Sequence, residues 1–288
     1  MPRLGFIGLG VMGQHMAARL AARELTVFDV NPARAAAIEG AQAAVDIAGV
    51  GRAADVVLLS LPSTPIVRDV VLGERGLASA MRPGGAIIDC STTEPSVSRE
   101  IGEALAAGDI DFMDAPVSGG ETAARAGTLA IMVGGRADVF ERYRPVLDEM
   151  ASSVVLVGDV GAGGVAKLVN NMIVGSAFAV IAESFALGKA NGIDPSALYE
   201  AIRGGWAGSK VLDVAAPGII ERDFTPGGSI DVLFKDIGYA LSLARSQNIP
   251  VPMTATVDEV LKAARASGRG PYAQQIIIEL WEGLLDLE

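Results

Sequence analysis

Short apolar runs alternate with helical stretches over the first half of this chain, and this alternation restricts the fold more than any other feature. Seven runs predict strands, at residues 4–7, 25–29, 56–61, 86–89, 112–117, 129–133 and 154–157. Helical periodicity predicts helices between most of them, at residues 12–22, 32–40, 66–72, 95–107 and 137–150. Alternating strands and helices form a mainly parallel sheet with helices on both faces. We therefore expect a doubly wound α/β domain.

The second half of the chain is predicted to be helical throughout. A long helix is expected over residues 163–190, roughly 40 Å at about 1.5 Å per residue. Further helices are expected at 195–203, 230–247, 253–267 and 272–285, separated by glycine and proline residues. A chain of 288 residues is long enough for two domains. We expect an α/β domain over residues 1–162 and an all-α domain over residues 163–288, joined by the long helix.

A glycine-rich turn follows the first predicted strand. The segment Gly8-Leu9-Gly10-Val11-Met12-Gly13 matches G-x-G-x-x-G and opens a predicted helix. In this layout the first glycine makes a tight turn, the second lets a pyrophosphate approach the backbone, and the third lets the helix pack on the strand. The helix N-terminus then faces the phosphates. The sequence thus predicts a Rossmann domain that binds a dinucleotide through Gly8, Gly10, Val11, Met12 and Gly13.

An acidic residue, Asp29, ends the second predicted strand, 21 residues after Gly8. A carboxylate at this place hydrogen-bonds the hydroxyls of the adenine ribose, and it repels a 2′-phosphate. No arginine follows until Arg34. We therefore expect NAD as the cofactor, with NADP left open because a loop arginine could swing toward a 2′-phosphate.

Charge and composition exclude several partners and sites. The formal net charge is −11 and no lysine precedes Lys167, so the clustered cations that bind a phosphate backbone are missing and no nucleic-acid partner is expected. One histidine, His15, and one cysteine, Cys90, cannot build an ordinary zinc site, and we expect no metal. We expect Cys90 to be a packed strand-end residue and His15 to be a phosphate-side or surface residue.

No segment is expected to cross a membrane. The most apolar stretch, residues 172–182, is bounded by Asn171 and Glu183. Eleven residues are too few to span a bilayer, so we interpret this stretch as a buried helix. The N-terminus runs straight into a strand pattern without a signal-peptide pattern. We expect a cytoplasmic protein.

The first lysine of the chain, Lys167, follows a glycine-rich segment, Gly161-Ala162-Gly163-Gly164. The chain has 18 arginines and five lysines, so a lysine at this place is unusual. An arginine does not release its proton in a protein, whereas a buried lysine can. Asn171 lies four residues later, on the same helix face. An ionisable amine beside an amide indicates an acid–base site.

Four segments together make the chain resemble the β-hydroxyacid dehydrogenase family, also called the 3-hydroxyisobutyrate dehydrogenase family. They are the turn over residues 5–13, Asp114-Ala115-Pro116-Val117-Ser118-Gly119-Gly120, the Lys167 segment, and Lys235-Asp236. The resemblance covers nearly the whole chain. It implies a Rossmann domain and a helical domain joined by a long helix, an NAD(P)-dependent oxidoreductase acting on a small carboxylate, and a homodimer or homotetramer.

The resemblance also implies roles for particular residues. Lys167 would be the general acid and base, and Asn171 would orient the reacting hydroxyl or carbonyl. Ser118, with the backbone of Gly119 and Gly120, would hold the substrate carboxylate.

Two further segments complete the implied site. Lys235 and Asp236 would close the site from the helical domain, and Lys235 would also reach the cofactor. Thr92 would lie near the nicotinamide.

Within the family, the chain is most similar to the branch of tartronate semialdehyde reductase (2-hydroxy-3-oxopropionate reductase). Residues 201–205, 207–209 and 211–213 and the pair Gly120-Glu121 carry this similarity. Trp206, Lys210 and Gly228 depart from the branch, and Trp206 and Lys210 are candidate substrate contacts. The alternative functions are dehydrogenases of L-serine, L-threonate, 4-hydroxybutyrate or a C3 sulfonate. The alternative role of Trp206 is packing between the two domains.

Other enzyme classes fit the sequence less well. No tyrosine has a lysine four residues later, as short-chain dehydrogenases require, and the ligands of a zinc-dependent alcohol dehydrogenase are missing. The 6-phosphogluconate dehydrogenases are longer and carry a histidine where Asn170 stands. Imine reductases usually replace the lysine that stands here as Lys167. A non-catalytic NAD-binding protein would be expected to lose that lysine as well.

Overall fold

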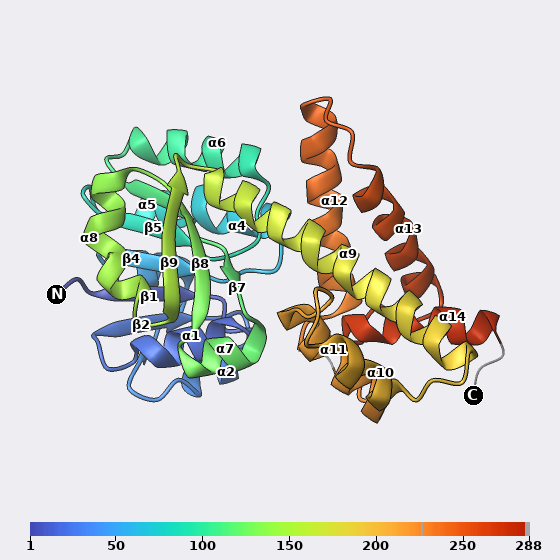
Figure 1. Ribbon diagram of the computed structural model, residues 1–288. Coiled ribbons are helices and arrows are strands. Elements are labelled where there is room, and N and C mark those ends of the chain that lie inside the picture. The colour runs from blue at the N-terminus through green and yellow to red at the C-terminus, as the bar shows by residue number, and fades with distance from the viewer. Residues whose placement is uncertain (226, 286–288) are drawn as a thin grey trace. The chain divides into compact units, whose positions relative to one another are not determined.

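The computed structural model describes residues 1–225 and 227–285 (Figure 1). The chain divides into two compact units, one over Met1–Lys167 and the other from Leu168 onward. Among the described residues, every strand lies in the first unit, and the second unit is helical. The long helix α9 (Ala162–Ala190) contributes residues to both units.

The first unit alternates strands and helices along the chain. Its strands are β1 (Leu4–Ile7), β2 (Leu25–Phe28), β3 (Gln42–Ala43), β4 (Val56–Leu59), β5 (Ala86–Asp89), β6 (Asp111–Asp114), β7 (Val117–Ser118), β8 (Leu129–Gly134) and β9 (Ala151–Gly158). Its helices before α9 are α1 (Gly13–Leu20), α2 (Pro32–Ala36), α3 (Ile47–Ala53), α4 (Thr64–Leu72), α5 (Leu77–Ala80), α6 (Pro95–Ala106), α7 (Gly120–Ala126) and α8 (Ala137–Leu147).

In the described part of the chain, nine strands form one sheet in the order β3-β2-β1-β4-β5-β6-β8-β7, with β9 beside β8. The strands from β3 to β6 are parallel, and β8 runs antiparallel to β6 and β7. The order 3-2-1-4-5-6 is the strand order of dinucleotide-binding folds. The predicted doubly wound, mainly parallel sheet is confirmed.

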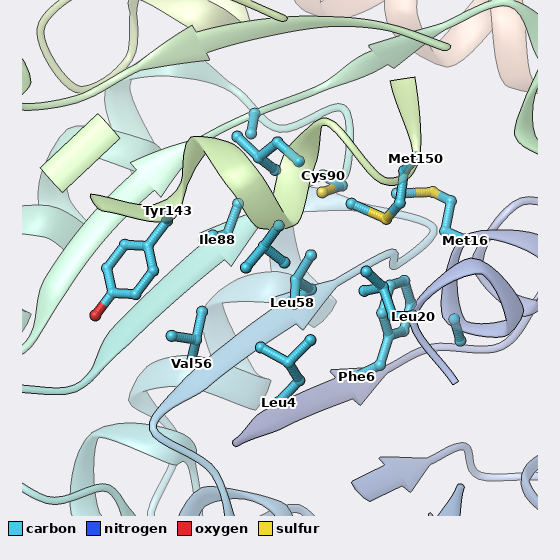
Figure 2. Close-up of a cluster of buried hydrophobic side chains, with 14 of the residues drawn as sticks. Leu4, Phe6, Met16, Leu20, Val56, Leu58, Ile88, Cys90, Tyr143 and Met150 are labelled. Carbon is cyan, nitrogen blue, oxygen red and sulfur yellow. The ribbon is translucent and has the colours of Figure 1, made fainter. Parts of the chain in front are cut away.

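Both faces of the sheet are covered, because successive side chains of a strand point to opposite faces. Figure 2 shows one of the two clusters, in which Leu4 and Phe6 of β1 pack with Leu58 of β4 and Leu20 of α1. On the other face, side chains of β4 and β5 pack against α3, α4 and α6. Each fully buried side chain of this size contributes about 1.5–3 kcal/mol, so the two clusters fix the helices to the sheet.

The carboxyl ends of the parallel strands meet at one edge of the sheet. Ile7 of β1 is in register with Phe28 of β2 and Leu59 of β4. Leu59 pairs with Asp89 of β5, which pairs with Asp114 of β6. The residues that follow each strand therefore leave the sheet along the same edge. Ligands of open α/β sheets bind at this edge, where the strand order reverses between β1 and β4.

The second unit contains α10 (Pro195–Ile202), α11 (Lys210–Glu221), α12 (Ile230–Ser246), α13 (Pro252–Ala266), the 3₁₀ helix η1 (Gln274–Ile277) and α14 (Ile278–Leu284). Its core joins one side of α9 to α11, α12 and α13, with Phe185, Leu212, Ile237 and Leu261 buried. The predicted helical half is confirmed.

Several predicted elements were wrong in extent. The strand expected over residues 112–117 is two strands, since Pro116 has no N–H for the ladder and the chain leaves the parallel sheet after Asp114. Helix α11 was missed, because Pro217 lies inside it and was interpreted as a break. The helix expected over residues 272–285 begins as the 3₁₀ helix η1. Helices α3, α5 and α7 were not predicted.

Helix α9 is apolar on both sides, which the sequence interpretation did not anticipate. By length and composition alone it could cross a membrane, with a mean hydropathy of 1.6 over 18 residues, of which 33% are buried. One such helix is weak evidence, because the core helix of a soluble protein passes the same test. Ile173 and Val180 are 66% and 54% exposed. The stretch 172–182 is therefore buried along one side only, so the expected buried helix is confirmed for that side and not for the other.

Candidate active site

The glycine turn after β1 has the backbone geometry that dinucleotide binding requires. Gly8 has a φ of 93°, and a Cβ there would collide with the Ser60 carbonyl oxygen. A Cβ on Gly13 would collide with the Gly8 carbonyl oxygen, so α1 starts in close contact with the turn. A Cβ on Gly10 would meet nothing within 4 Å, which leaves open space beside the backbone. Val11 is exposed next to that space.

The start of α1 can accept a phosphate. The side chain of Met12, the N-cap residue, makes no capping hydrogen bond, and the N–H groups of Gln14 and His15 are bonded to the backbone carbonyls of Gly10 and Met12. The N-terminus of a helix favours anions through its dipole and its N–H groups. The residues present at this turn therefore fit a dinucleotide pyrophosphate.

Asp29 follows β2 and is anchored by the same turn. Its carboxylate accepts hydrogen bonds from the Leu9 N–H at 2.7 Å and from the Asn31 N–H at 2.8 Å. The guanidinium of Arg34 lies 3.8 Å from the carboxylate and is half exposed. Asp29, which is expected to repel a 2′-phosphate, and Arg34, whose guanidinium could bind one, are thus neighbours.

The end of β5 carries a buried polar network. Asp89 accepts hydrogen bonds from the Ser91 N–H at 2.9 Å and the Thr93 hydroxyl at 2.7 Å, and burial raises the pKa of its carboxyl. Thr92, between these two donors, is partly exposed. Cys90 is buried, and burial raises the pKa of its thiol, which makes it unreactive as a nucleophile. The expectation of a packed Cys90 is confirmed.

The start of α9 is anchored by a buried carboxylate at the end of β6. Asp114 accepts hydrogen bonds from the Gly161 N–H and the Gly164 N–H, both at 2.6 Å. A Cβ on Gly163 would collide with the Met132 carbonyl oxygen and lie 2.5 Å from the Asp114 carbonyl oxygen. Only glycine lets the helix approach the sheet this closely. The glycine-rich segment before Lys167 therefore seats the helix.

Two opposing effects act on the ionisation of Asp114. Its two N–H donors favour the carboxylate, whereas burial and the nearby carboxylate of Asp89 favour the neutral acid. Burial is the largest effect and raises the pKa of Asp114 to about 7. Asp114 thus lies four residues before Ser118, and its partner Gly164 lies about one helical turn before Lys167.

The Ser118 turn is formed by two successive glycines with positive φ. Gly119 has a φ of 132° and Gly120 has a φ of 70°, and α7 begins at Gly120. Ser118 is partly exposed, and both glycines are exposed. The hydroxyl and the backbone of this turn are accessible to a ligand. The two glycines form a defined turn that leads into helix α7.

Lys167 and Asn171 lie four residues apart on α9, so they share a helix face. Asn171 is buried, and its side-chain N–H donates to Asp236 at 2.7 Å, while its oxygen accepts from Asn170 at 2.9 Å. The Lys235 ammonium donates to the other oxygen of Asp236 at 2.6 Å. Asp236 therefore orients both Asn171 and Lys235. This connection explains why an aspartate follows Lys235.

Two predicted substrate contacts lie elsewhere on the second unit. Trp206 is in the loop between α10 and α11 and is fully exposed. Lys210 is exposed at the first position of α11, whose N-cap is Ser209. No hydrogen bond between the described residues joins either of them to Asn171 or Asp236.

Comparisons with known proteins identify the family. Residues 3–158 match the model of the NAD binding domain of 6-phosphogluconate dehydrogenase. Residues 161–281 match the model for NAD-binding of NADP-dependent 3-hydroxyisobutyrate dehydrogenase. A 2-(hydroxymethyl)glutarate dehydrogenase from Eubacterium barkeri is 39% identical over 285 residues, which cover 97% of this chain and 95% of that protein. The chain belongs to the 3-hydroxyisobutyrate dehydrogenase family.

Other members agree with this assignment. A 2-hydroxy-3-oxopropionate reductase from Escherichia coli (strain K12) is 35% identical over 283 residues, covering 97% of each chain. The crystal structure of a 3-hydroxyisobutyrate dehydrogenase from Salmonella typhimurium superposes with a TM-score of 0.88 at 30% identity, covering 96% of this chain and 99% of that one. As a family member, the chain is an NAD(P)-dependent oxidoreductase that acts on CH–OH groups.

Sequence reasoning overlooked two features of this family member. Asp114 is part of a quoted motif, but its role at the start of α9 depends on a contact across 47 positions of sequence. The imidazole Nε2 of His15 lies 3.1 Å from a carboxylate oxygen of Glu121. His15, expected on the phosphate side or the surface, lies in the first turn of α1, partly buried and bonded to the helix that follows the Ser118 turn.

Proposed function

We propose that this enzyme transfers a hydride between NAD(P) and a small 3-hydroxy carboxylic acid or its semialdehyde, with Lys167 as the general acid and base. The observation that supports this most is the arrangement around Asp114. That residue holds the start of the helix that carries Lys167 and Asn171, and it lies four residues before Ser118. One buried group therefore connects the segments expected to bind the substrate and to move its proton.

A dinucleotide held by the glycine turn would supply or accept the hydride through its nicotinamide. In oxidation, the neutral amine of Lys167 accepts the proton of the substrate hydroxyl, and in reduction its ammonium returns a proton to the carbonyl oxygen. Asn171 has one side-chain N–H bonded to Asp236, and its other N–H would donate to the same substrate oxygen. The Ser118 hydroxyl and the N–H groups of Gly119 and Gly120 bind the carboxylate.

Lys235 contacts the substrate carboxylate or the cofactor from α12. Its ammonium is bonded to Asp236 and lies 4.8 Å from the ring centre of Tyr239, so its position is defined from two sides. We assign Asp236 an orienting role, because it is 3% exposed and its oxygens accept from Asn171 and Lys235. Trp206 and Lys210 are kept as candidate substrate contacts.

The cofactor turn comprises Gly8, Gly10, Val11, Met12 and Gly13. Thr92, with Lys235, contacts the nicotinamide half of the cofactor.

We propose NAD as the preferred cofactor, because Asp29 lies where the adenine ribose would bind. Arg34, 3.8 Å from that carboxylate, is the residue that would accept NADP.

The substrate is proposed to resemble 2-hydroxy-3-oxopropionate or 3-hydroxyisobutyrate. A second candidate is 2-(hydroxymethyl)glutarate, which shares the HO–CH₂–CH–COO⁻ unit of 3-hydroxyisobutyrate and carries a larger substituent on C2. The Eubacterium barkeri relative bears that name.

Steady-state kinetics with NAD and NADP test the proposal. The panel comprises 3-hydroxyisobutyrate, D-glycerate, 2-(hydroxymethyl)glutarate, L-serine, L-threonate, 4-hydroxybutyrate and a C3 sulfonate, with tartronate and succinic semialdehydes in the reverse direction. Lys167→Ala should lower kcat about 10²- to 10⁴-fold and leave NADH binding unchanged. Lys189→Ala is the matched control, because that lysine lies on the same helix but pairs with Glu282 at 3.1 Å. Full activity of Lys167→Ala would refute the mechanism.

Four further features are proposed with it. The functional domains are residues 1–162 and 163–288, and the enzyme is cytoplasmic. It forms a homodimer or homotetramer, and it has no nucleic-acid, membrane or metal partner. The exposed apolar residues Ile173, Val180 and Leu187 on α9 support an oligomer. Light scattering after size-exclusion chromatography measures the subunit number.

A further inference from the structure

A hydrogen bond connects α1 to α7, which lie side by side in the first unit (Figure 1). The His15 Nε2 atom lies 3.1 Å from Glu121 Oε1, and the two side chains are 19% and 31% exposed. The contact joins residues 106 positions apart in the sequence. His15 is the one histidine of the chain.

The two partners stand at the ends of two different proposed ligand sites. His15 is two residues beyond Gly13, in the first turn of the helix that fits a pyrophosphate. Glu121 directly follows Gly120, in the turn proposed to hold the substrate carboxylate. A shift of α1 on cofactor binding would therefore be transmitted to the Ser118 turn through this contact.

The charged groups around the contact between His15 and Glu121 make it stronger at lower pH. Glu121 also pairs with Arg125 at 2.7 Å, and His15 and then Arg125 hold the pKa of Glu121 below its ordinary value. Arg19 lies on the same face of α1, with its guanidinium against Gly127. Glu121 therefore stays ionised at neutral pH. Imidazole is the side chain whose ordinary chemistry allows a change of charge between about pH 5 and pH 8.

We propose that His15 and Glu121 form a positioning pair that couples cofactor binding at the α1 turn to the Ser118–Gly120 turn, and that the pair tightens when His15 is protonated. A protonated imidazole adds an ion pair to the hydrogen bond. A bound pyrophosphate is negative and favours the protonated form, so by reciprocity the protonated form binds the dinucleotide more tightly. The coupling to substrate rests on the proposed function of the Ser118 turn.

Four variants test the pair. His15→Gln keeps a hydrogen-bond donor and removes the titration, Glu121→Gln removes the charge from the other side, and the double variant combines them. Arg23→Gln is the control, because Arg23 pairs with Glu149 near the other end of α1. NADH dissociation constants by fluorescence titration, and KM and kcat for the best substrate of the panel, are measured from pH 6 to pH 8.5.

In the wild type, NADH affinity should weaken about fivefold more between pH 6 and pH 8.5 than in His15→Gln or Glu121→Gln. The substrate KM should follow the same pattern, while kcat changes less than about twofold, because neither residue moves the reacting proton. The double variant should equal the single variants, and Arg23→Gln should keep the wild-type pH profile. A wild-type pH profile in His15→Gln, or additive losses in the double variant, would overturn the proposal.

Amide hydrogen exchange over residues 118–127 separates this proposal from the proposed function, because it needs no turnover. NADH should slow exchange there in the wild type at pH 6, and it should do so less in His15→Gln and in Glu121→Gln. If no 3-hydroxy acid is oxidised but this difference appears, the coupling holds and the proposed reaction fails. If the reaction is found and NADH slows exchange equally in all variants, the coupling is refuted.

Discussion

The substitution Asp114→Asn distinguishes the two effects that act on the buried carboxylate at the start of α9. Asparagine has nearly the same shape but cannot ionise, and it offers one oxygen to the N–H groups of Gly161 and Gly164, where the carboxylate offers two. Near pH 5 the wild-type group is largely protonated, because its pKa is raised to about 7. The two proteins should then differ in unfolding free energy by only about 1 kcal/mol.

The difference between the two proteins should grow with pH. Between the ordinary pKa of 3.8 and the raised value of about 7, the folded state holds a proton that the unfolded state has released. The stability of the wild type therefore falls as pH rises through this window. A difference of about 3 pH units at about 1.4 kcal/mol each gives about 4 kcal/mol. The variant lacks this loss, so at pH 8 it should be the more stable protein, with a Tm roughly 8–16 °C higher.

The catalytic activity of Asp114→Asn should fall, although its stability at pH 8 should rise. The ionised carboxylate accepts both N–H groups and fixes the first turn of α9, so the variant should lose about tenfold or more in kcat/KM through misplacement of Lys167.

Thermal melts followed by circular dichroism between pH 5 and pH 8.5 measure the stability difference. Glu141→Gln, which removes one exposed carboxylate of the same unit, controls for net charge. A Tm difference that shifts in favour of the wild type as pH rises would refute the reasoning. It would mean that the two N–H donors outweigh burial.

Three further outcomes are expected. Asp236→Asn should lower kcat/KM about tenfold, because it removes a charge-assisted bond that orients Asn171 and Lys235; unchanged kinetics would contradict this role. Gly163→Ala should cost about 2 kcal/mol in a denaturant titration, because its Cβ would collide with backbone, whereas Gly164→Ala, whose Cβ would lie 3.3 Å from its nearest neighbour, should cost less. Arg34→Ala should lower kcat/KM for NADP about tenfold relative to NAD, and equal losses with both cofactors would exclude a role in 2′-phosphate recognition.

The fold was predictable because its main signals are local. The strands β1, β2, β4 and β5 are short apolar runs, and the glycine turn after β1 follows a spacing set by backbone geometry. The helices that were missed lack such a signal. Helix α11 contains Pro217, and α7 contains mostly small residues whose packing depends on α1 and β8.

Sequence motifs predicted which residues belong to the candidate site, but not the contacts that these residues make. Lys167 and Asn171 share a helix face by spacing alone, so their relation follows from sequence. The bond from Asn171 to Asp236 spans 65 positions, and the bond from Gly164 to Asp114 spans 50. Neither spacing carries a local signal, because each pair meets only after the sheet or the helical unit has formed.

The glycines at the start of α9 illustrate this limit. The segment Gly161-Ala162-Gly163-Gly164 has the composition of a flexible turn, yet Gly163 lies inside a helix. A Cβ on Gly163 would lie 2.9 Å from the Gly134 nitrogen, and a Cβ on Gly134 would lie 2.7 Å from the Gly163 nitrogen. A side chain at either Gly134 or Gly163 would therefore collide with the backbone of the other residue, although the two lie 29 positions apart in the sequence. Since α9 carries Lys167 one turn later, this close contact between β8 and α9 also determines where the proposed acid–base group lies.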